Sequence, residues 1–336
     1  MKSSKGINAM LGGNGSNLVE LLVPKTLSDA ATALVEAMNL NSIEQTRRHG
    51  RTVIIKKRNF LGESLARLAN SYFATAGLHL RFLEKASQWQ QREVDSYNLL
   101  NQDQFEARPL GKRGVLEDKL PGRSIWDHMK RGTLTRAMIV AAAKELRRAH
   151  ELKSAEFRDY WSHGDATTTN AIYNEKSNRV RWIDFEIVHD KWLPATARHA
   201  IDVRVFLMDM VGQMSLRQWL SFALCFVTAY GDHAVITEMR KRLTLPGGLA
   251  WVWWEVRSNF TAPTQIKRRL AKLREAISKL EIYRGVAARA RHQRLPSTNC
   301  QAIKPGIPNA SSRTRAIRER AKAASPGMPR RLPITR

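Results

Sequence analysis

The sequence predicts an α+β fold in which a small, strand-containing N-terminal part precedes a mostly helical C-terminal part. The run Arg51-Thr-Val-Ile-Ile-Lys-Lys57 is rich in β-branched residues and follows a His49-Gly50 turn, which is typical of the second strand of a hairpin. A second hairpin is predicted over Ala171–Phe185, where a polar turn separates two strands. From His199 to Ile282, apolar residues recur at helical spacing.

The N-terminal part is expected to combine strands and helices. Residues 1–24 hold several Gly, Ser and Asn without periodicity, so we expect a flexible leader there. The apolar pair Val115-Leu116 ends a further strand. Helical spacing predicts three helices, at Thr26–Met38, Gly62–Ala76 and Leu80–Leu100.

The C-terminal part is expected to be helical outside its hairpin. Ser124 and Thr135 are N-cap residues, which predicts helices that end near Met129 and His150. Four more helices are predicted, at His199–Gln213, Leu216–Tyr230, Asp232–Arg242 and Thr264–Ile282. The aromatic run Trp251-Val-Trp-Trp254 is expected to pack these helices together, with stacking on a sugar or a base as the alternative.

Composition narrows the function classes. The chain has 336 residues, of which 43% are hydrophobic, so it is long and apolar enough for a sizeable core. Its two cysteines cannot form a disulfide framework or a cysteine-rich zinc site. The sequence shows neither the apolar core of a signal peptide nor a membrane-spanning run. We therefore expect a cytoplasmic protein, with peripheral association at the inner face of the membrane as a variant.

The charge is strongly positive and uneven. Lys and Arg number 56 and Asp and Glu number 30, which gives a formal net charge of +26. Residues 285–336 carry twelve Lys or Arg and one acid, and they lack apolar residues that could form a core. We expect these residues to be a basic, disordered tail. Such charge attracts anionic membrane surfaces, phosphorylated substrates or, less favoured here, nucleic acid.

One stretch carries specific chemistry. Ser162-His-Gly-Asp-Ala-Thr-Thr-Thr-Asn170 is followed 14 residues later by Asp184-Phe-Glu186. The pattern HGDxxxxN with a later Asp-Phe-Glu resembles the protein-kinase-like phosphotransferases, and most closely the branch that contains aminoglycoside phosphotransferases, choline kinases and lipopolysaccharide-core kinases. The resemblance covers about residues 52–206 and implies a two-lobed fold, with a small N-lobe at 25–118 and a helical C-lobe at 119–284.

The resemblance implies a role for each polar residue of the motif. Asp165 is the expected catalytic base, which accepts the proton of the acceptor hydroxyl. Asn170 and Asp184 are the expected metal ligands, which hold Mg²⁺ against the phosphates of ATP. His163 and Asp202 are expected to support the loop rather than react. A polar hairpin mouth without chemistry is the alternative interpretation.

The nucleotide-binding residues are expected upstream of this motif. Val53-Ile-Ile-Lys56 resembles the strand whose lysine contacts the nucleotide phosphates, and Lys57 competes for that role because neighbouring strand residues face opposite sides. Glu93 is the first candidate to hold the lysine, with Glu84 second. The segment Glu117-Asp-Lys-Leu120-Pro-Gly122 resembles the hinge whose backbone holds adenine.

The predicted function is ATP- and Mg²⁺-dependent phosphotransfer to a hydroxyl of a small molecule, sugar or glycolipid such as lipopolysaccharide core. Two features depart from the family. No Gly-rich loop precedes Lys56, and only about a dozen residues separate Glu186 from the helix near His199, which disfavours a protein substrate. The alternative is a catalytically weak kinase-like scaffold that binds membrane or nucleic acid through its basic surface.

Overall fold

The structure is a computed structural model that describes residues 40–48, 50–102 and 104–293, with side chains described through residue 280. The chain divides into two compact units, Met1–Gly285 and Val286–Arg336, and the candidate site lies in the first. The predicted leader, the predicted helix at Thr26–Met38 and residues 294–336 lie outside the described residues. No helix of the described part is long and apolar enough to span a membrane.

A four-stranded antiparallel sheet forms the N-terminal part, in the order β1-β2-β5-β4. Its strands are β1 (Asn41–Arg48), β2 (Arg51–Arg58), β4 (Ala107–Leu110) and β5 (Gly114–Asp118). The predicted hairpin that ends at Lys57 is confirmed as β1 and β2, which turn at Gly50. In β2, Val53 and Ile55 lie on one face with Leu116, while Lys56 and Arg58 lie buried on the other.

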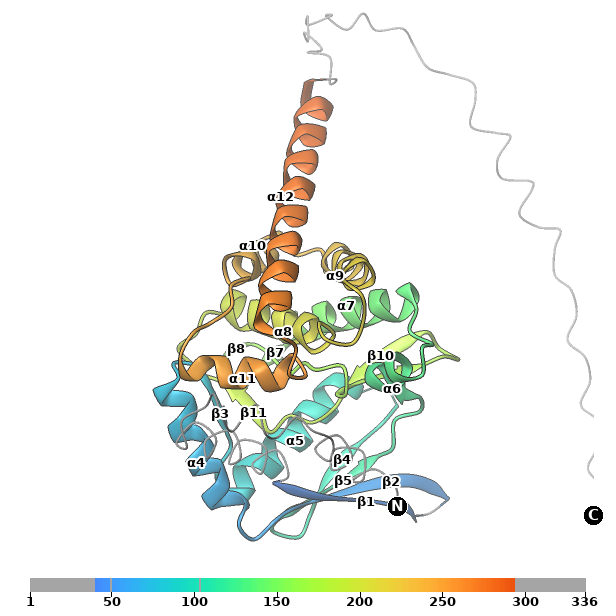
Figure 1. Ribbon diagram of the computed structural model, residues 1–336. Coiled ribbons are helices and arrows are strands. Elements are labelled where there is room, and N and C mark those ends of the chain that lie inside the picture. Colours follow the sequence, from blue (N-terminus) through green and yellow to red (C-terminus); the bar gives the residue numbers. More distant parts are fainter. Residues whose placement is uncertain (1–39, 49, 103, 294–336) are drawn as a thin grey trace, which may run out of the picture. The chain divides into compact units, whose positions relative to one another are not determined.

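Two helices and a short strand follow β2. They are α4 (Gly62–Thr75), β3 (Leu80–Phe82) and α5 (Ala86–Asn101), and α5 packs against β4 and β5 (Figure 1). The prediction of one helix over Leu80–Leu100 is wrong at its start. Leu80 and Phe82 are buried with Arg81 half-exposed between them, a period of two, and this strand pairs with β11 (Ile187–His189).

The C-terminal part is mostly helical. Ser124 and Thr135 accept the backbone N–H of Asp127 and Met138, so both predicted N-caps are confirmed. The helices are α6 (Ile125–Lys130), α7 (Arg136–His150), α8 (Ala195–Asp209), α9 (Leu216–Tyr230), α10 (His233–Lys241), α11 (Leu249–Arg257) and α12 (Pro263–Gln293). Helix α7 packs against α9, and α8 packs against α10 and α11.

Three helical predictions need correction. Helix α8 begins after Pro194, four residues before the predicted start, because proline is favourable where a helix begins. Helix α11 was not predicted, since Trp251–Trp254 shows no polar face that would reveal a helical period. Helix α12 continues to Gln293, so residues 285–293 are helical rather than the start of a disordered tail.

Small strands complete the fold around the motif loop. The predicted second hairpin is confirmed as β9 (Ala171–Asn174) and β10 (Arg179–Trp182), and β6 (Arg123–Ser124) pairs with β9. Strands β7 (Lys153–Ser154) and β8 (Asp159–Tyr160) form a separate pair. Helix α7 packs on β9 and β10, which fixes the hairpin against the helices (Figure 1). The mixed architecture of antiparallel sheets and helices agrees with the predicted α+β class.

Candidate active site

The β9–β10 hairpin brings the two expected metal ligands to the same end. Ala171 and Trp182 face each other as the first register pair, so Asn170 precedes one strand and Asp184 follows the other. The backbone N–H of Ile183 donates to the Asn170 carbonyl over 3.0 Å, which joins the two chain segments just beyond the strands. Asn170 also donates through Nδ2 to the Asp165 carbonyl at 3.0 Å. The structure therefore brings Asp165, Asn170 and Asp184 to one hairpin mouth.

Two carboxylates of α8 hold the backbone of the motif loop. Asp202 accepts the N–H groups of His163 and Gly164 over 2.8 and 2.9 Å. Asp209 accepts the N–H of Thr168 over 2.8 Å and also its hydroxyl. The two acids are seven residues apart, which places them on one helix face two turns apart. Helix α8 thus fixes the loop on both sides of Asp165.

Gly164 is required by the same loop. Its φ is +90°, and a Cβ atom there would lie 2.1 Å from the carbonyl oxygen of Ile187. Both facts exclude a side chain at this position. The glycine therefore lets the loop pass against β11 directly before Asp165.

Buried histidines surround Asp202. His150 Nε2 lies 3.1 Å from the Asp202 carboxylate, and His189 Nε2 lies 3.8 Å from it. Burial lowers the pKa of His163 to about 3 and that of His189 to about 4, and it lowers the pKa of His150 well below its ordinary value. These rings are neutral at pH 7, so they act as hydrogen-bonding supports of the loop.

Asp165 lies beside a cation from the C-terminal helices. Its Oδ1 is 2.7 Å from Nη1 of Arg257, the last residue of α11. Burial, opposed by Arg257 and supported by Asp184 and Asp209, raises the pKa of Asp165 to about 6. A carboxyl group with this pKa is ionised at pH 7 and is still basic enough to accept a proton during a reaction.

Asp184 has an unusual backbone conformation. Its φ is +68°, a left-handed conformation that non-glycine residues adopt infrequently and that concentrates at functional sites. Burial raises the pKa of Asp184 above its ordinary value. Among the residues that the structure describes, none donates a hydrogen bond to this carboxylate. The side chain is therefore available to a ligand.

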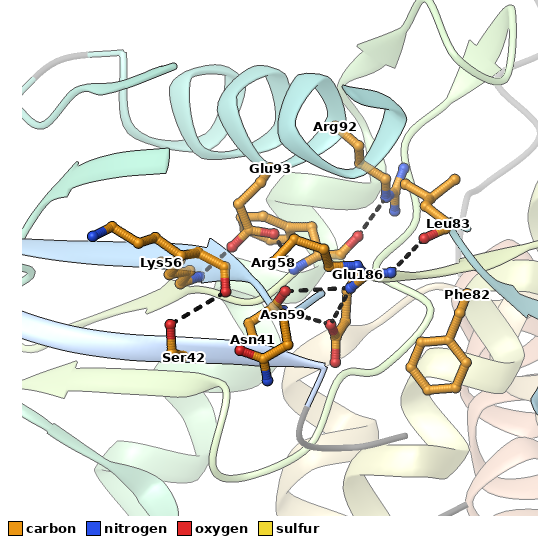
Figure 2. Close-up of polar contacts among 12 residues, drawn as sticks. Asn41, Ser42, Lys56, Arg58, Asn59, Phe82, Leu83, Arg92, Glu93 and Glu186 are labelled. Atoms are coloured by element: carbon orange, nitrogen blue, oxygen red, sulfur yellow. Dashed lines mark hydrogen bonds and ion pairs between the residues drawn. The ribbon is translucent and has the colours of Figure 1, made fainter. Parts of the chain in front are cut away.

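Lys56 is buried between two glutamates. Its Nζ pairs with Glu93 (Figure 2) and lies 3.1 Å from Glu117. Burial alone would lower the pKa of Lys56, but the carboxylates of Glu117, Glu93 and Asp184 raise it well above its ordinary value.

The two alternative residues lie elsewhere. Lys57 is exposed on the other face of β2, and Glu84 accepts a hydrogen bond from Asn70. The structure thus places Lys56 and Glu93 together, and Lys57 and Glu84 apart from them.

Helix α5 joins the Lys56 pair to both motif loops. Glu93 accepts the N–H of Phe185 over 2.9 Å, so one carboxylate contacts the lysine and the residue after Asp184. The neighbouring Arg92 donates to the Phe185 carbonyl at 2.8 Å and to the Ser162 carbonyl at 3.0 Å. A shift of α5 would therefore move Lys56 and the backbone around both motifs at once.

Glu186 ties the second motif to the sheet. Arg58 donates to Glu186 over 3.2 Å, and Asn41 donates to the same oxygen over 2.7 Å (Figure 2). Arg58 also donates to the Leu83 carbonyl. Burial raises the pKa of Glu186 well above its ordinary value, and repulsion from Asp184 is the second cause of this rise. Arg58 opposes this shift, because it stabilises the ionised form. Since Arg58 lies on β2 and Asn41 on β1, both strands anchor the loop that carries Asp184.

The segment expected as a hinge connects the sheet to the helices. Glu117 is central in the sheet, since β5 lies between β2 and β4, and its side chain faces Lys56. Leu120 is 6% exposed and lines an open cavity of about 480 Å³ together with residues 118–122. Gly122 has φ +117°, and a Cβ atom there would lie 2.0 Å from the Tyr173 carbonyl oxygen.

The Lys56 end of the polar site is closed, whereas Asp165 and Asp184 are half-buried. Lys56 is 4% exposed, Glu93 is fully buried and Asn170 is 6% exposed. Four cavities of the described part are lined by residues other than Lys56, Asp165 and Asp184. The largest of these, about 840 Å³, lies on the other side of α5 along Arg92 and Trp161. A nucleotide can reach Lys56 only if the site opens.

The donor set fits a magnesium ion. Among the described residues, no three His, Cys, Asp or Glu side chains form a complete metal site. Mg²⁺ rarely uses a complete protein cage, because it takes one or two carboxylates and fills its octahedron with phosphate oxygens and water. Asp184 offers such a carboxylate, and Asn170 donates through Nδ2, which leaves its Oδ1 for an ion.

Several site residues were missed in the sequence. Asp209 follows Asp202 by two helical turns, so helical spacing could have found it. Arg58 follows Lys56 by two residues, so strand alternation could have placed both on one face. Arg257 has no such signal, because its partner Asp165 is 92 residues away in the sequence.

Comparison with known proteins gives structural likenesses only. No protein-family model matches the chain, and no curated protein matches it. An ethanolamine kinase from Plasmodium vivax is similar at 10% identity and a TM-score of 0.40, over 70% of this chain and 79% of that one. The Rv3197 protein of Mycobacterium tuberculosis, solved with erythromycin, is similar at 12% identity and a TM-score of 0.33, over 64% of this chain and 67% of that one. Both TM-scores are below 0.5, so neither likeness by itself establishes the fold or the activity.

Proposed function

We propose that this chain is a Mg²⁺-dependent kinase that transfers the γ-phosphoryl group of ATP to a hydroxyl of a small molecule, sugar or glycolipid such as lipopolysaccharide core. The observation that carries the proposal is the hairpin mouth, where Asp165, Asn170 and Asp184 meet. The Lys56–Glu93 pair supports it, because Glu93 also holds the backbone after Asp184. In this proposal, the sheet part and the helical part are the two lobes of a kinase-like fold.

Each residue has one task in the proposed reaction. The acceptor oxygen attacks the γ-phosphorus, the bond to the bridging oxygen breaks, and ADP leaves. Asp165 accepts the hydroxyl proton, which its raised pKa favours. Asn170 and Asp184 would hold Mg²⁺, which neutralises phosphate charge when it is bound. Lys56 binds phosphate oxygens, and Leu120 with the hinge backbone contacts the adenine.

The closed site requires a movement for this reaction. Lys56 contacts two carboxylates and is 4% exposed, so a phosphate can reach its ammonium group only if a neighbouring group moves. Glu117 is the one to yield, because burial raises its pKa to about 8, against the opposing effect of Lys56. Protonation of Glu117 removes one of the two ion-pair contacts of Lys56 and leaves the contact with Glu93. We propose that ATP binding separates Glu117 from Lys56.

Nucleotide-dependent stabilisation and turnover test the proposal. We expect ATP with Mg²⁺ to raise the unfolding temperature, and ATP with EDTA to raise it less, because a ligand that binds the native state stabilises it. Asp184→Asn should lose the magnesium dependence. Asp95→Asn, a carboxylate elsewhere on α5, is the matched control and should behave as the wild type.

Turnover then assigns the acceptor. ATP consumption should be screened over ethanolamine, choline, aminoglycosides, macrolides and lipopolysaccharide-core sugars. The proposal fails if no acceptor is phosphorylated or if Asp184→Asn retains full turnover. The closed site favours one second candidate, a kinase-like scaffold without turnover. A scaffold predicts no magnesium-dependent stabilisation in the first experiment.

A further inference from the structure

Helix α11 brings a buried cation to the candidate catalytic base. The Arg257 side chain is 8% exposed, and its Nη1 lies 2.7 Å from Oδ1 of Asp165. Its guanidinium lies over the Trp253 ring, 4.1 Å from the ring centroid. Stacking and ion pairing together hold the planar group in one orientation.

Two nitrogen atoms of this guanidinium lack a partner. Nε and Nη2 of Arg257 are buried and have no hydrogen-bond partner among the described residues. A buried donor that is left unsatisfied is unfavourable by roughly 1–3 kcal/mol, and more when the group is charged. Arg58, which ties Glu186 to the sheet, also leaves its Nε unpaired but donates through both Nη1 and Nη2. Arg257 instead uses Nη1 alone.

The chemistry of the unpaired atoms indicates their ligand. The N–H groups of a guanidinium form a fork that matches two oxygens of a phosphate or a carboxylate. The loop from Asp165 to Asn170 contains no Lys or Arg, and Lys56 is already shared by two glutamates. Within the described residues, Arg257 is in ion-pair contact with one carboxylate only. It is therefore a cation of this site with donors to spare for an anion.

We propose that Arg257 binds an oxyanion beside Asp165 through its Nε and Nη2 groups. If the proposed kinase function holds, this oxyanion is either the γ-phosphoryl group of ATP or an acidic group on the acceptor. Both sources present the same chemistry, a tetrahedral or planar set of anionic oxygens. In either case Arg257 holds the anion next to the carboxylate that takes the hydroxyl proton.

Inorganic phosphate tests the site without turnover. The full chain is titrated with phosphate at constant ionic strength, set with chloride, and the unfolding temperature is followed. Arg257→Lys keeps the charge beside Asp165 but removes the fork, and Arg257→Gln removes the charge as well. Arg217→Gln, on α9, is the control, because it has the same change in net charge away from this site.

We expect phosphate to stabilise the wild type and Arg217→Gln equally. Phosphate should bind both Arg257 variants at least about tenfold more weakly, the loss of one charge-assisted hydrogen bond. Equal phosphate binding in the wild type and Arg257→Lys would overturn the proposal, and so would the absence of phosphate binding in the wild type. Arg257→Lys is the decisive variant if Arg257→Gln fails to fold.

Nucleotides separate the two sources. The titration is repeated with saturating Mg²⁺ and either ADP or a non-hydrolysable ATP analogue. If the ATP analogue abolishes phosphate binding and ADP does not, the oxyanion at Arg257 is the γ-phosphoryl group of ATP. If phosphate still binds in the presence of either nucleotide, the oxyanion is an acidic group of the acceptor. If both nucleotides abolish phosphate binding, the anion lies away from Asp165, which would overturn the proposal. Phosphate binding that depends on Arg257 in a chain that binds no nucleotide would refute the kinase function alone.

Discussion

The Lys56 side and the Asp165 side of the candidate site are held in different ways. On the Lys56 side, β2, α5 and β5 meet through ion pairs between side chains, with Lys56 between Glu93 and Glu117. On the Asp165 side, the carboxylates of α8 accept backbone N–H groups on both sides of Asp165. The first arrangement can exchange one partner for a phosphate, whereas the second fixes the chain itself.

This difference indicates which side moves. Backbone N–H groups that lose a buried carboxylate have no other acceptor, so the Asp165 loop stays in place. Glu117 can take up a proton and leave Lys56 without exposing a charge. We therefore expect the loop to be the rigid part of the site and the Lys56 cluster to be the adaptable part.

The largest expected effect is on turnover, when Asp165 on the rigid side is replaced. Asp165→Asn removes the proposed proton acceptor and should lower kcat about 10²–10⁴-fold, the usual contribution of a general base. ATP affinity should change little, since Lys56 and the proposed metal ligands Asn170 and Asp184 remain. Steady-state kinetics with the identified acceptor and a nucleotide titration measure the two quantities. A variant with full turnover would mean that Asp165 is structural.

The second effect is on the stability of the rigid side. Asp202→Asn replaces a carboxylate that accepts two backbone N–H groups by an amide with a single acceptor oxygen, next to His150. We expect the free energy of unfolding to fall by about 2–5 kcal/mol, at about 1–3 kcal/mol for each unsatisfied group. Asp209→Asn should be milder, because Asp209 holds one backbone N–H, that of Thr168. Urea denaturation compares the two, and a larger loss for Asp209→Asn would contradict this account of the loop.

The third effect separates the two lysines of β2. Lys56→Met should weaken ATP binding about 10–100-fold, the loss of one or two charge-assisted hydrogen bonds. Lys57→Met is the matched control, since Lys57 is exposed on the other face. Calorimetric titration with ATP and Mg²⁺ measures both. Equal losses would show that the lysines act through general charge rather than through the site.

The last prediction tests the adaptable side by pH. Burial raises the pKa of Glu117 to about 8, so between its ordinary value near 4.5 and pH 8 the folded chain holds a proton that the unfolded chain has lost. This group therefore makes stability fall as pH rises through that window, by up to about 1.4 kcal/mol per pH unit for one proton. Glu117→Gln should remove this slope.

Urea denaturation at pH 5 to 9 provides the comparison. The difference in unfolding free energy between Glu117→Gln and the wild type should grow with pH up to about 8 and then level off. The buried histidines titrate in both proteins and cancel in the difference. A constant difference across this range would show that Glu117 is already ionised at low pH, and the proposed exchange at Lys56 would lose its basis.

The sequence is informative where local spacing has a structural meaning. Strand alternation alone places Lys56 and Lys57 on opposite faces of β2, and the N-caps Ser124 and Thr135 mark where two helices begin. The spacing of Asp165, Asn170 and Asp184 within and after a hairpin places all three at its mouth. The predicted start of α5 at Leu80 shows where local spacing fails. Strand β3 has only three residues, which is too short for its period of two to be distinguished from the helix that follows.

Local spacing by itself determined the hairpins, the caps and the polar motif of this protein, because each depends on residues a few positions apart. Tertiary structure alone decided that Glu117 shares Lys56 with Glu93, that Asp209 holds Thr168, and that Arg257 reaches Asp165. These contacts join residues tens of positions apart, and packing of whole elements sets them. Burial adds the electrostatic consequence, because only the folded chain removes the water that would otherwise level the pKa values of its carboxylates.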